Sequence, residues 1–217
     1  MASTPLTDIR QAAQITVGTI EDFPMIYENL IRQFPKTELY EYGDFLNLLH
    51  GGRYRILMYR NADGQLIGYA LVFFPESSSV FWLDYLAITQ PFQSHGYGQK
   101  LFQAVHQKYC GPYEGMILSV EQVDESDPAK AKRQKRRIEF YEKLGAYRLH
   151  ANFLQPWEEG SFPMHLYYKP KTVPSNLGRT VQAKAIAQMY AYCCASFPTS
   201  RNLLSKFQDT IVDEHFA

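Results

Sequence analysis

A loop with two glycines is the first feature of this sequence whose chemistry can be read from residue types and spacing. It reads Gln93-Ser-His-Gly-Tyr-Gly-Gln99, and it lies between an apolar run at residues 80–88 and a helical pattern that begins near Gly98. Backbone N–H groups point outward at the start of a helix, and glycine lets an anion approach them closely. The loop therefore predicts a phosphate site. The alternative is an ordinary tight turn, which a Gly-x-Gly pair alone does not exclude.

A second feature is a basic cluster at residues 130–137, where six of the eight residues are Lys or Arg. If a helix begins after Asp127 as its N-cap, these cations lie in its N-terminal half, where the helix dipole disfavours positive charge. Nearby acids such as Asp124 and Glu125 can compensate part of that charge, and a bound anion can compensate the rest. The alternatives are a solvated basic face, or a helix that begins only after about Gln134.

Hydrophobic periodicity predicts the elements that must position these residues. Apolar runs favour strands at residues 15–20, 54–59, 66–74, 80–88, 116–120, 147–154 and 164–169. Apolar residues at helical spacing favour helices at residues 21–34, 39–49, 98–109 and 128–144. The order β-α-α-β-β-β-α-β-α-β-β predicts an α/β fold with a mixed central sheet and helices on both faces.

The two ends of the chain stand apart from this order. Residues 1–13 read as an N-terminal arm, and residues 170–178 have the composition of a linker. Residues 180–196 and 198–211 each carry an apolar helical face. We therefore expect a C-terminal helical extension, an α-hairpin within residues 171–217. Its apolar faces must be covered, either by the domain or by a second copy of the chain in a homodimer.

Composition excludes several classes of protein. Apolar residues make up 46% of the 217 residues and charged residues 20%, as in a globular domain and not a disordered or fibrous one. The 22 Lys and Arg residues balance the 22 Asp and Glu residues, which argues against a surface built for nucleic acid. Three Cys residues without a CxxC pair predict buried thiols and no metal site. No signal peptide or membrane span is recognisable, so we expect a cytoplasmic protein.

Two motifs resemble signatures of the GNAT family of N-acetyltransferases. The pattern Gln93-x-x-Gly96-x-Gly98 resembles the family's acyl-CoA pyrophosphate loop, Arg/Gln-x-x-Gly-x-Gly/Ala. Further on, Ile138-Glu-Phe-Tyr-Glu-Lys-Leu-Gly-Ala146 resembles a helix that reads Phe-Tyr-x-x-Leu-Gly-Phe. Both occur in the family's order with a strand between them, and the resemblance covers residues 14–170. The chain departs from the family at Ala146, where Phe is usual, and before the helix tyrosine, where Asn is frequent.

The resemblance implies a GNAT-type fold and acetyl-CoA as the cofactor. The backbone of Leu86, Ala87 and Ile88 would pair with the pantetheine arm as an added strand does. The loop would bind the pyrophosphate through Gln93, Ser94, His95, Gly96, Tyr97, Gly98 and Gln99. His95 occupies a position where the family often has a basic residue, so it would be a neighbour of the phosphates. Arg133, in the basic cluster, would also contact the cofactor, whose 3′-phosphate is one candidate for the bound anion.

The reaction implied is direct attack of an amine on the acetyl thioester, without a covalent enzyme intermediate. Tyr141 matches the family's helix tyrosine and would protonate the leaving thiolate; the alternative is a packed aromatic residue. An alkyl amine has a pKa near ~10, so a base must remove its proton. Glu121, at the end of a strand, is the favoured base, and Asp84 is the second candidate. Their alternatives are a solvated acid at a strand end and a cross-strand partner.

The sequence indicates only the general chemistry of the amine that would accept the acetyl group. Residues 21–44 contain six acids and two bases, and in the GNAT fold the first two helices wall the acceptor pocket. An acidic wall would favour a cationic primary amine, on a small molecule or a peptide. Two other functions stay open. One is a non-catalytic sensor or scaffold that binds acyl-CoA. The other is an RNA-directed acetyltransferase that uses the basic cluster, against which the zero net charge argues.

Overall fold

One central sheet runs through the molecule. The computed structural model describes residues 14–217, so the expected N-terminal arm at residues 1–13 lies outside the described residues. The strand order is β1-β2-β3-β4-β5-β8-β6, and β7 pairs with β8. These strands are β1 (Gln14–Val17), β2 (Tyr54–Arg60), β3 (Leu66–Phe73), β4 (Val80–Ile88), β5 (Gly115–Glu121), β6 (Tyr147–Arg148), β7 (Leu154–Trp157) and β8 (Gly160–Pro170). All neighbours are antiparallel except β4 and β5, which are parallel. The predicted mixed α/β sheet is confirmed.

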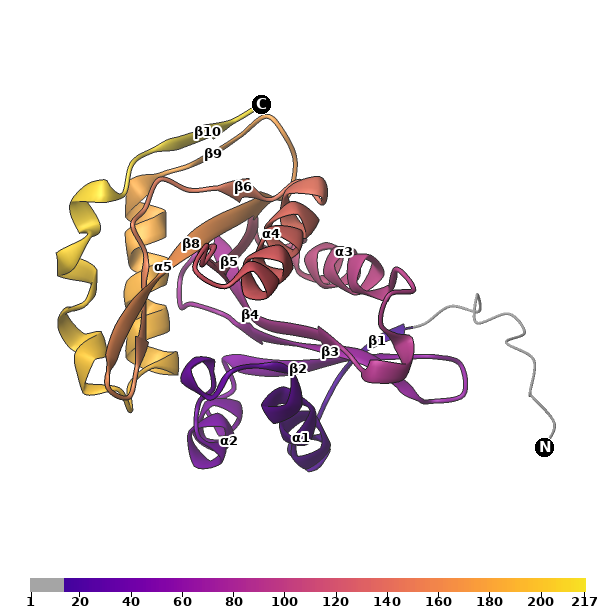
Figure 1. The fold of residues 1–217 in the computed structure, drawn as a ribbon. Coiled ribbons are helices and arrows are strands. Elements are labelled where there is room, and N and C mark those ends of the chain that lie inside the picture. The colour runs from indigo at the N-terminus through magenta and orange to yellow at the C-terminus, as the bar shows by residue number, and fades with distance from the viewer. Residues whose placement is uncertain (1–13) are drawn as a thin grey trace, which may run out of the picture.

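Helices cover both faces of the sheet, with α1 and α2 on one side and α3 and α4 on the other (Figure 1). The helices are α1 (Phe23–Gln33), α2 (Tyr42–His50), α3 (Tyr97–Tyr109), α4 (Pro128–Lys143) and α5 (Arg179–Cys193). Successive side chains of β4 point to opposite faces of the sheet and so contribute to both cores. Trp82 packs in the core that α1, α2 and α5 share, whereas Phe81 and Leu83 pack in the core under α3 and α4. No helix within residues 14–217 is both long enough and apolar enough to cross a membrane.

The N-terminus of α4 is formed as its sequence predicts. The side chain of Asp127 accepts hydrogen bonds of 3.0 Å from the backbone N–H groups of Ala129 and Lys130. Gly145 follows the helix with a φ of +77°, a conformation that glycine adopts without strain. The helix therefore begins at Pro128, and the alternative start after about Gln134 is wrong.

Two other expected elements differ in their bounds. The helix expected at residues 39–49 begins at Tyr42, because the preceding segment forms the 3-10 turn η2 (Lys36–Glu38) and Leu39 is extended. Glu38 therefore lies at the end of η2, between the α-helices α1 and α2. The strand expected at residues 147–154 is divided into β6 and the first residue of β7.

The expected C-terminal α-hairpin is wrong in its second helix. After α5 the chain forms three short 3-10 turns, η4 (Pro198–Asn202), η5 (Leu204–Lys206) and η6 (Gln208–Thr210). Side chains compete with the α-helical bonds here. The hydroxyl of Ser205 donates to the carbonyl of Asn202 at 2.8 Å, and that of Thr210 donates to the carbonyl of Phe207 at 2.7 Å. The expected linker contains a strand, β9 (Ser175–Leu177), which pairs with β10 (Glu214–Phe216).

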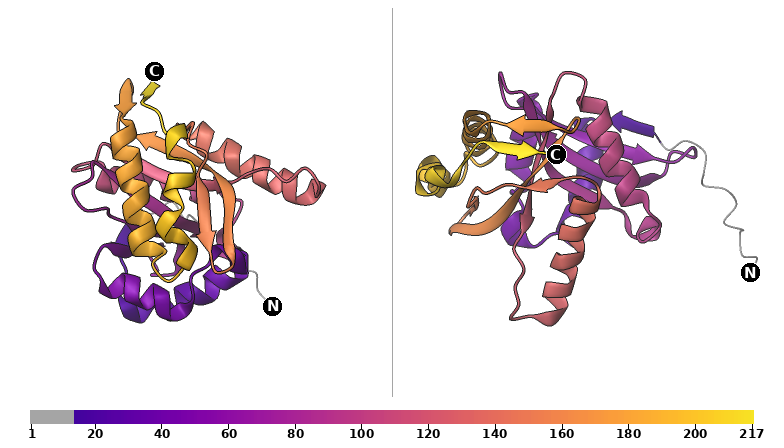
Figure 2. Two further views of the ribbon diagram at one scale, coloured as in Figure 1. Left: turned by 90° about the vertical axis from the view of Figure 1, so that its left-hand side faces the viewer. Right: turned by 90° about the horizontal axis from the view of Figure 1, so that it is seen from above.

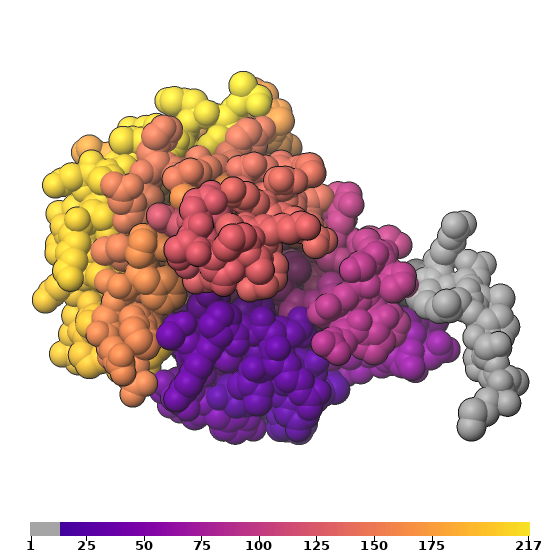
Figure 3. Space-filling model, in the orientation of Figure 1, coloured from indigo at the N-terminus to yellow at the C-terminus, as the bar shows by residue number. Residues whose placement is uncertain are grey.

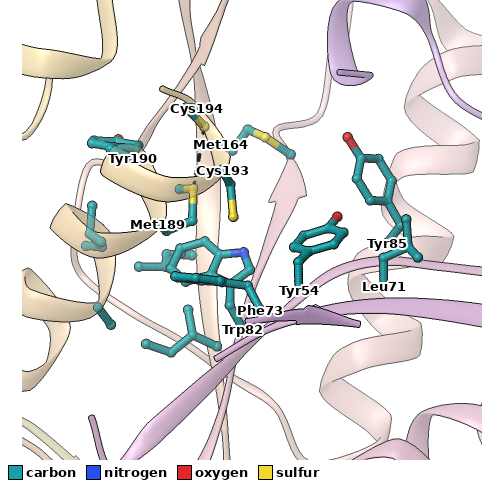
Figure 4. Packing of buried hydrophobic residues seen from close by; sticks show 14 of the residues in the cluster. Tyr54, Leu71, Phe73, Trp82, Tyr85, Met164, Met189, Tyr190, Cys193 and Cys194 are labelled. Atoms are coloured by element: carbon teal, nitrogen blue, oxygen red, sulfur yellow. Dashed lines mark hydrogen bonds between the residues drawn. The ribbon is translucent and has the colours of Figure 1, made fainter. Parts of the chain in front are cut away.

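Residues 171–217 share the core of the domain. In Figure 2, α5 and the 3-10 turns lie beside the β7–β8 hairpin. Figure 4 shows Met189 and Cys193 of α5 against Trp82 and Phe73 of the sheet, and all four side chains are buried. All three cysteines are free and buried, as predicted. The apolar face of α5 was expected to pack either on the domain or on a second copy of the chain, and in the structure it packs on the domain.

Candidate active site

The strands β4 and β5 separate along their length, and this separation opens the site. Their parallel pairing runs from Val80 and Gly115 only as far as Leu83 and Leu118. Beyond that point β4 stays paired to β3 on its other edge, up to Ile88. The edge of β4 that faces β5 is therefore unpaired over residues 84–88. The backbone N–H and C=O groups on this edge that do not pair with β3 can bind an extended ligand, because unpaired strand edges accept an added strand; the carbonyl of Ile88 accepts a hydrogen bond from the side chain of Gln93.

A β-bulge lies at the point of separation. Leu71 of β3 is opposite Tyr85 and Val72 is opposite Leu83, so Asp84 is an extra residue in β4. Successive strand residues normally point to opposite faces, and a bulge interrupts that alternation. Asp84 and Tyr85 therefore both face the layer of α1 and α2. The bulge brings a carboxylate and a phenol to the same side of the sheet.

Asp84 is held by hydroxyl groups. The hydroxyl of Tyr54 donates a hydrogen bond of 2.5 Å to Asp84 Oδ2. Burial raises the pKa of Asp84 to about 7, while hydrogen bonds from Tyr54 and Tyr40 oppose that rise. The alternative expected for Asp84 was a cross-strand partner, but Tyr54 belongs to β2, which β3 separates from β4. Asp84 is also a carboxyl that can exchange a proton near neutral pH.

A cleft of about 490 Å³ opens between the separated strands. In the space-filling view a hollow lies between α4 and the α1–α2 layer, next to α3 (Figure 3). Its walls come from α1, η2, β4, β5, α4 and the β7–β8 hairpin. The lining residues are Gln33, Phe34, Glu38, Asp84, Tyr85, Leu86, Ala87, Ile88, Gln93, Ser119, Glu121, Arg133, Arg136, Arg137, Phe140, Tyr141, Gln155 and Met164.

Eight of the residues predicted from the sequence meet in this cleft. They are Asp84, Leu86, Ala87, Ile88, Gln93, Glu121, Arg133 and Tyr141. The other predicted residues are not among its walls: Ser94, His95, Gly96, Tyr97, Gly98 and Gln99 surround the adjoining start of α3. Tyr97 is buried against Tyr59 and Phe92, so only its backbone can take part in binding.

The glycine loop has the backbone shape of an anion site. Ser94 and Gly96 both have positive φ, +64° and +78°, and Gly96 directly precedes α3. A left-handed residue followed by right-handed helical residues, as at Gly96 and the start of α3, turns successive N–H groups toward one side, and the first N–H groups of a helix have no intrahelical acceptor. The side-chain amide of Gln93 donates a hydrogen bond of 2.9 Å to the backbone carbonyl of Ile88, which connects the loop to the end of β4. The imidazole of His95 is exposed, with Nδ1 2.6 Å from the carbonyl oxygen of Gln93.

The basic cluster divides into paired and unpaired cations. Lys130 lies 3.0 Å from Asp124 and Lys135 lies 2.8 Å from Glu125, so the preceding acids do compensate part of the charge. Arg133 and Arg136 line the cleft, and neither has an ion-pair partner within residues 14–217. These two guanidinium groups can bind phosphate or carboxylate groups in bidentate fashion.

Tyr141 lies at the inner wall of the cleft. It is buried on α4 and packs against Phe102 and Phe140, with ring centroids 5.4 and 5.1 Å away. Burial raises the pKa of Tyr141 to about 12, and Arg137, one helical turn earlier, opposes that rise. The phenol therefore carries its proton at neutral pH. Tyr141 is the packed aromatic residue expected as the alternative, and its position at the cleft leaves the acid role as a prediction.

Two carboxylates of the cleft, those of Glu121 and Glu38, interact with cations of α4. Glu121, at the end of β5, accepts a hydrogen bond from the guanidinium of Arg137. Glu38, on η2, lines the same cleft, and its pKa is raised to about 7 by burial and by the charge of Glu121. Arg137 and Lys130 oppose that rise.

Sequence reasoning did not identify Glu38, Arg136 or Arg137 as site residues. The only signals were the acid-rich segment 21–44 and the basic cluster. Neither signal distinguishes these three side chains from their neighbours.

Comparisons with known proteins bear on the sequence and the fold of this chain. Residues 53–145 match the family model described as an acetyltransferase (GNAT) domain. That range runs from β2 to the end of α4 and contains the glycine loop, Asp84, Glu121 and Tyr141. Glu38 and the C-terminal extension lie outside it. A comparison with curated proteins finds no match.

Solved structures share the fold at low sequence identity. A GNAT-family protein from Bacteroides thetaiotaomicron is 20% identical, with a TM-score of 0.60 over 73% of this chain and 88% of that chain. NAA60 from Arabidopsis thaliana, in complex with acetyl-CoA, is 16% identical, with a TM-score of 0.53 over 74% and 99%. Spermidine N-acetyltransferase from Vibrio cholerae is 15% identical, with a TM-score of 0.52 over 73% and 93%. The predicted GNAT fold is confirmed.

Proposed function

We propose that this chain, whose residues 53–145 match the model of a GNAT acetyltransferase domain, transfers the acetyl group of acetyl-CoA to a primary amine. One observation carries the proposal. A single cleft joins the unpaired edge of β4, a phenol that keeps its proton and several carboxylates. Direct transfer from a thioester to an amine needs these three parts: a place for the donor, an acid for the leaving thiolate and a base for the amine.

The donor side of the cleft would hold CoA. The pantetheine arm would pair with the backbone at residues 86–88, and the pyrophosphate would lie on the amides of residues 93–99. Arg133, with Arg136 beside it, would bind a phosphate group. The fold similarity to NAA60 solved with acetyl-CoA supports this donor.

The acceptor side would be the part of the cleft that holds the carboxylates. Glu38, Asp84 and Glu121 line the cleft, and Arg137 is paired with Glu121. Carboxylates attract an ammonium group, which supports a cationic amine on a small molecule or a peptide. The acceptor would attack the thioester carbon directly. As the C–S bond breaks, the hydroxyl of Tyr141 would protonate the sulfur.

The test is a screen of amine acceptors with acetyl-CoA, read out as release of free CoA thiol. The panel contains spermidine, a peptide with a free N-terminus and one lysine, and acetate as an anionic control. Turnover with a cationic acceptor supports the proposal. Binding of acetyl-CoA without thiol release across the panel contradicts it, as does a preference for neutral or anionic acceptors.

A further inference from the structure

Glu38 occupies a distinctive place among the carboxylates of the cleft. It lies on the short turn η2 between α1 and α2, outside the region matched by the family model. The hydroxyl of Tyr85, in the bulged part of β4, donates a hydrogen bond to the backbone carbonyl of Glu38. That contact fixes the turn against the sheet and holds the Glu38 side chain at the cleft wall.

The carboxylate of Glu38 has no hydrogen-bond partner in residues 14–217, whereas those of Glu121 and Asp84, the two base candidates from the sequence, each accept a hydrogen bond. Glu121 accepts a hydrogen bond from Arg137 through Oε1, and its Oε2 is buried without a partner in the described part of the chain. Asp84 accepts the 2.5 Å bond from Tyr54. Within residues 14–217 the carboxylate of Glu38 makes no hydrogen bond and no ion pair. The carboxylate of Glu38 is therefore the one of the three that is open to an incoming ammonium group, since Arg137 holds Glu121 and the phenol of Tyr54 holds Asp84.

Charged groups on two elements act on Glu38. The charge of Glu121, on β5, raises the pKa of Glu38, whereas the charges of Arg137 and Lys130, on α4, lower it. The phenol of Tyr85, on β4, contacts the backbone carbonyl of Glu38. Burial and the charge of Glu121 outweigh the two cations, so the pKa of Glu38 is raised to about 7. A group with this pKa is largely ionised at slightly alkaline pH and still accepts a proton readily.

We propose that Glu38 is the general base that removes a proton from the ammonium group of the acceptor, an inference that rests on the acetyl transfer proposed above. The ammonium gives one proton to the Glu38 carboxylate, which passes it to solvent. The neutral nitrogen forms the N–C bond, and the C–S bond breaks. The sulfur takes the proton of Tyr141, and the second proton lost from the nitrogen restores the phenol. Glu121, held by Arg137, then acts as a positioning residue.

The experiment compares Glu38→Gln with a matched control, Glu41→Gln. Glu41 carries the same charge three residues away but is not among the walls of the main cleft. Rates are measured with spermidine and with the lysine peptide between pH 5.5 and 9.5. Glu38→Gln should lower kcat at pH 7.5 by roughly 10²-fold and remove the rise in kcat/KM near pH 7, since a general base contributes about 10²–10⁴-fold. Glu38→Asp should restore part of the rate, and Glu41→Gln should keep the wild-type profile.

Three results would overturn the inference. Glu38→Gln could retain the wild-type rate and profile, Glu121→Gln could remove the rise near pH 7 while Glu38→Gln keeps it, or Asp84→Asn could do so. A second readout needs no acceptor: the ¹³C resonances of the glutamate carboxyls are followed by NMR against pH. A resonance that titrates near pH 7 and is missing from Glu38→Gln supports the inference, and a normal titration of Glu38 contradicts it. Wild-type enzyme that is inactive with every amine contradicts the proposed function instead, because the NMR result is independent of turnover.

Discussion

The guanidinium of Arg137 donates a hydrogen bond to the carboxylate of Glu121, and this ion pair ties α4 to the end of β5 across the cleft. The Arg137 side chain is 41% exposed and that of Glu121 is 18% exposed, so the pair is neither fully solvated nor fully buried. Arg137 also lies one helical turn before Tyr141. The pair therefore connects the end of β5 with the helix that carries Tyr141.

Arg137→Met should have two effects. Loss of the cation leaves Glu121 half-buried without a partner, which should lower the free energy of unfolding by about 1–2 kcal/mol, less than for a fully buried pair. Because Arg137 lowers the pKa of Glu38, its removal should also move the rise of kcat/KM to higher pH. Urea denaturation and a pH–rate profile measure both effects. Arg136→Met is the control, and equal effects in the two variants would contradict the role of the pair.

Tyr141→Phe should lower kcat by about 10–10²-fold and leave the Kd of acetyl-CoA nearly unchanged. The hydroxyl would act only as the thiolate leaves, and the phenyl ring keeps the packing against Phe102 and Phe140. Steady-state kinetics and isothermal titration calorimetry with acetyl-CoA separate the two quantities. Wild-type turnover in this variant would remove Tyr141 from the acid role.

Asp84→Asn should change how stability depends on pH. Burial raises the pKa of Asp84 from 3.8 to about 7, so the folded protein binds this proton more tightly than the unfolded chain does. The resulting stability is fully present below pH 3.8 and is lost as the pH rises to about 7.

Asn carries no such charge. We compare the free energy of unfolding of Asp84→Asn with that of wild type. This difference should favour the variant more at pH 8 than at pH 5, by about 1–3 kcal/mol after allowance for screening at the cleft. Urea unfolding at the two pH values measures the difference. The pKa of Glu38 is also raised, so Asp84→Asn should still lose some stability as the pH rises toward 7. That remaining loss should be smaller in the double variant Asp84→Asn with Glu38→Gln. Parallel pH curves for wild type and Asp84→Asn would contradict this prediction.

Gly96→Ala should weaken acetyl-CoA binding more than its cost in stability explains. Gly96 has a φ of +78°, where a side chain costs about 1–2 kcal/mol, and it directly precedes the expected phosphate-binding N-terminus of α3. Gly52→Ala is a matched control, because Gly52 has a φ of +75° and, like Gly96, open space around the added methyl. Both variants should lose similar stability by thermal unfolding. A loss of acetyl-CoA affinity in Gly52→Ala equal to that in Gly96→Ala would contradict the role of the loop.

Ile186→Ala should destabilise the whole domain, since Ile186 of α5 is fully buried in the core that α1 and α2 share. Removal of a buried isoleucine side chain costs about 2–5 kcal/mol. The control is Val212→Ala at a side chain that is 41% exposed, with a change below about 0.5 kcal/mol. A single unfolding transition at lower denaturant is the expected result. A second, separate transition for the C-terminal part would show that it folds independently.

Local patterns in the sequence were sufficient for the features that depend on neighbouring residues. The helix start at Asp127, the left-handed Gly96 before α3 and the alternation along β4 are set by caps, backbone freedom and side-chain period, which act over a few positions. The order of the elements along the chain and the two motifs that resemble GNAT signatures followed from the same local information. They were enough to predict the fold and most of one wall of the cleft.

Only the tertiary structure decided which side chains meet. The bulge at Asp84 depends on the register of β3, and the separation of β4 from β5 depends on where their pairing stops. Six acids in residues 21–44 look alike in the sequence, yet the fold of η2 brings Glu38 into the cleft that Arg137 and Glu121 line. At residues 198–210, side-chain hydrogen bonds to the backbone outweighed an apolar helical spacing. Contacts between distant segments follow from packing and register, which no local period specifies.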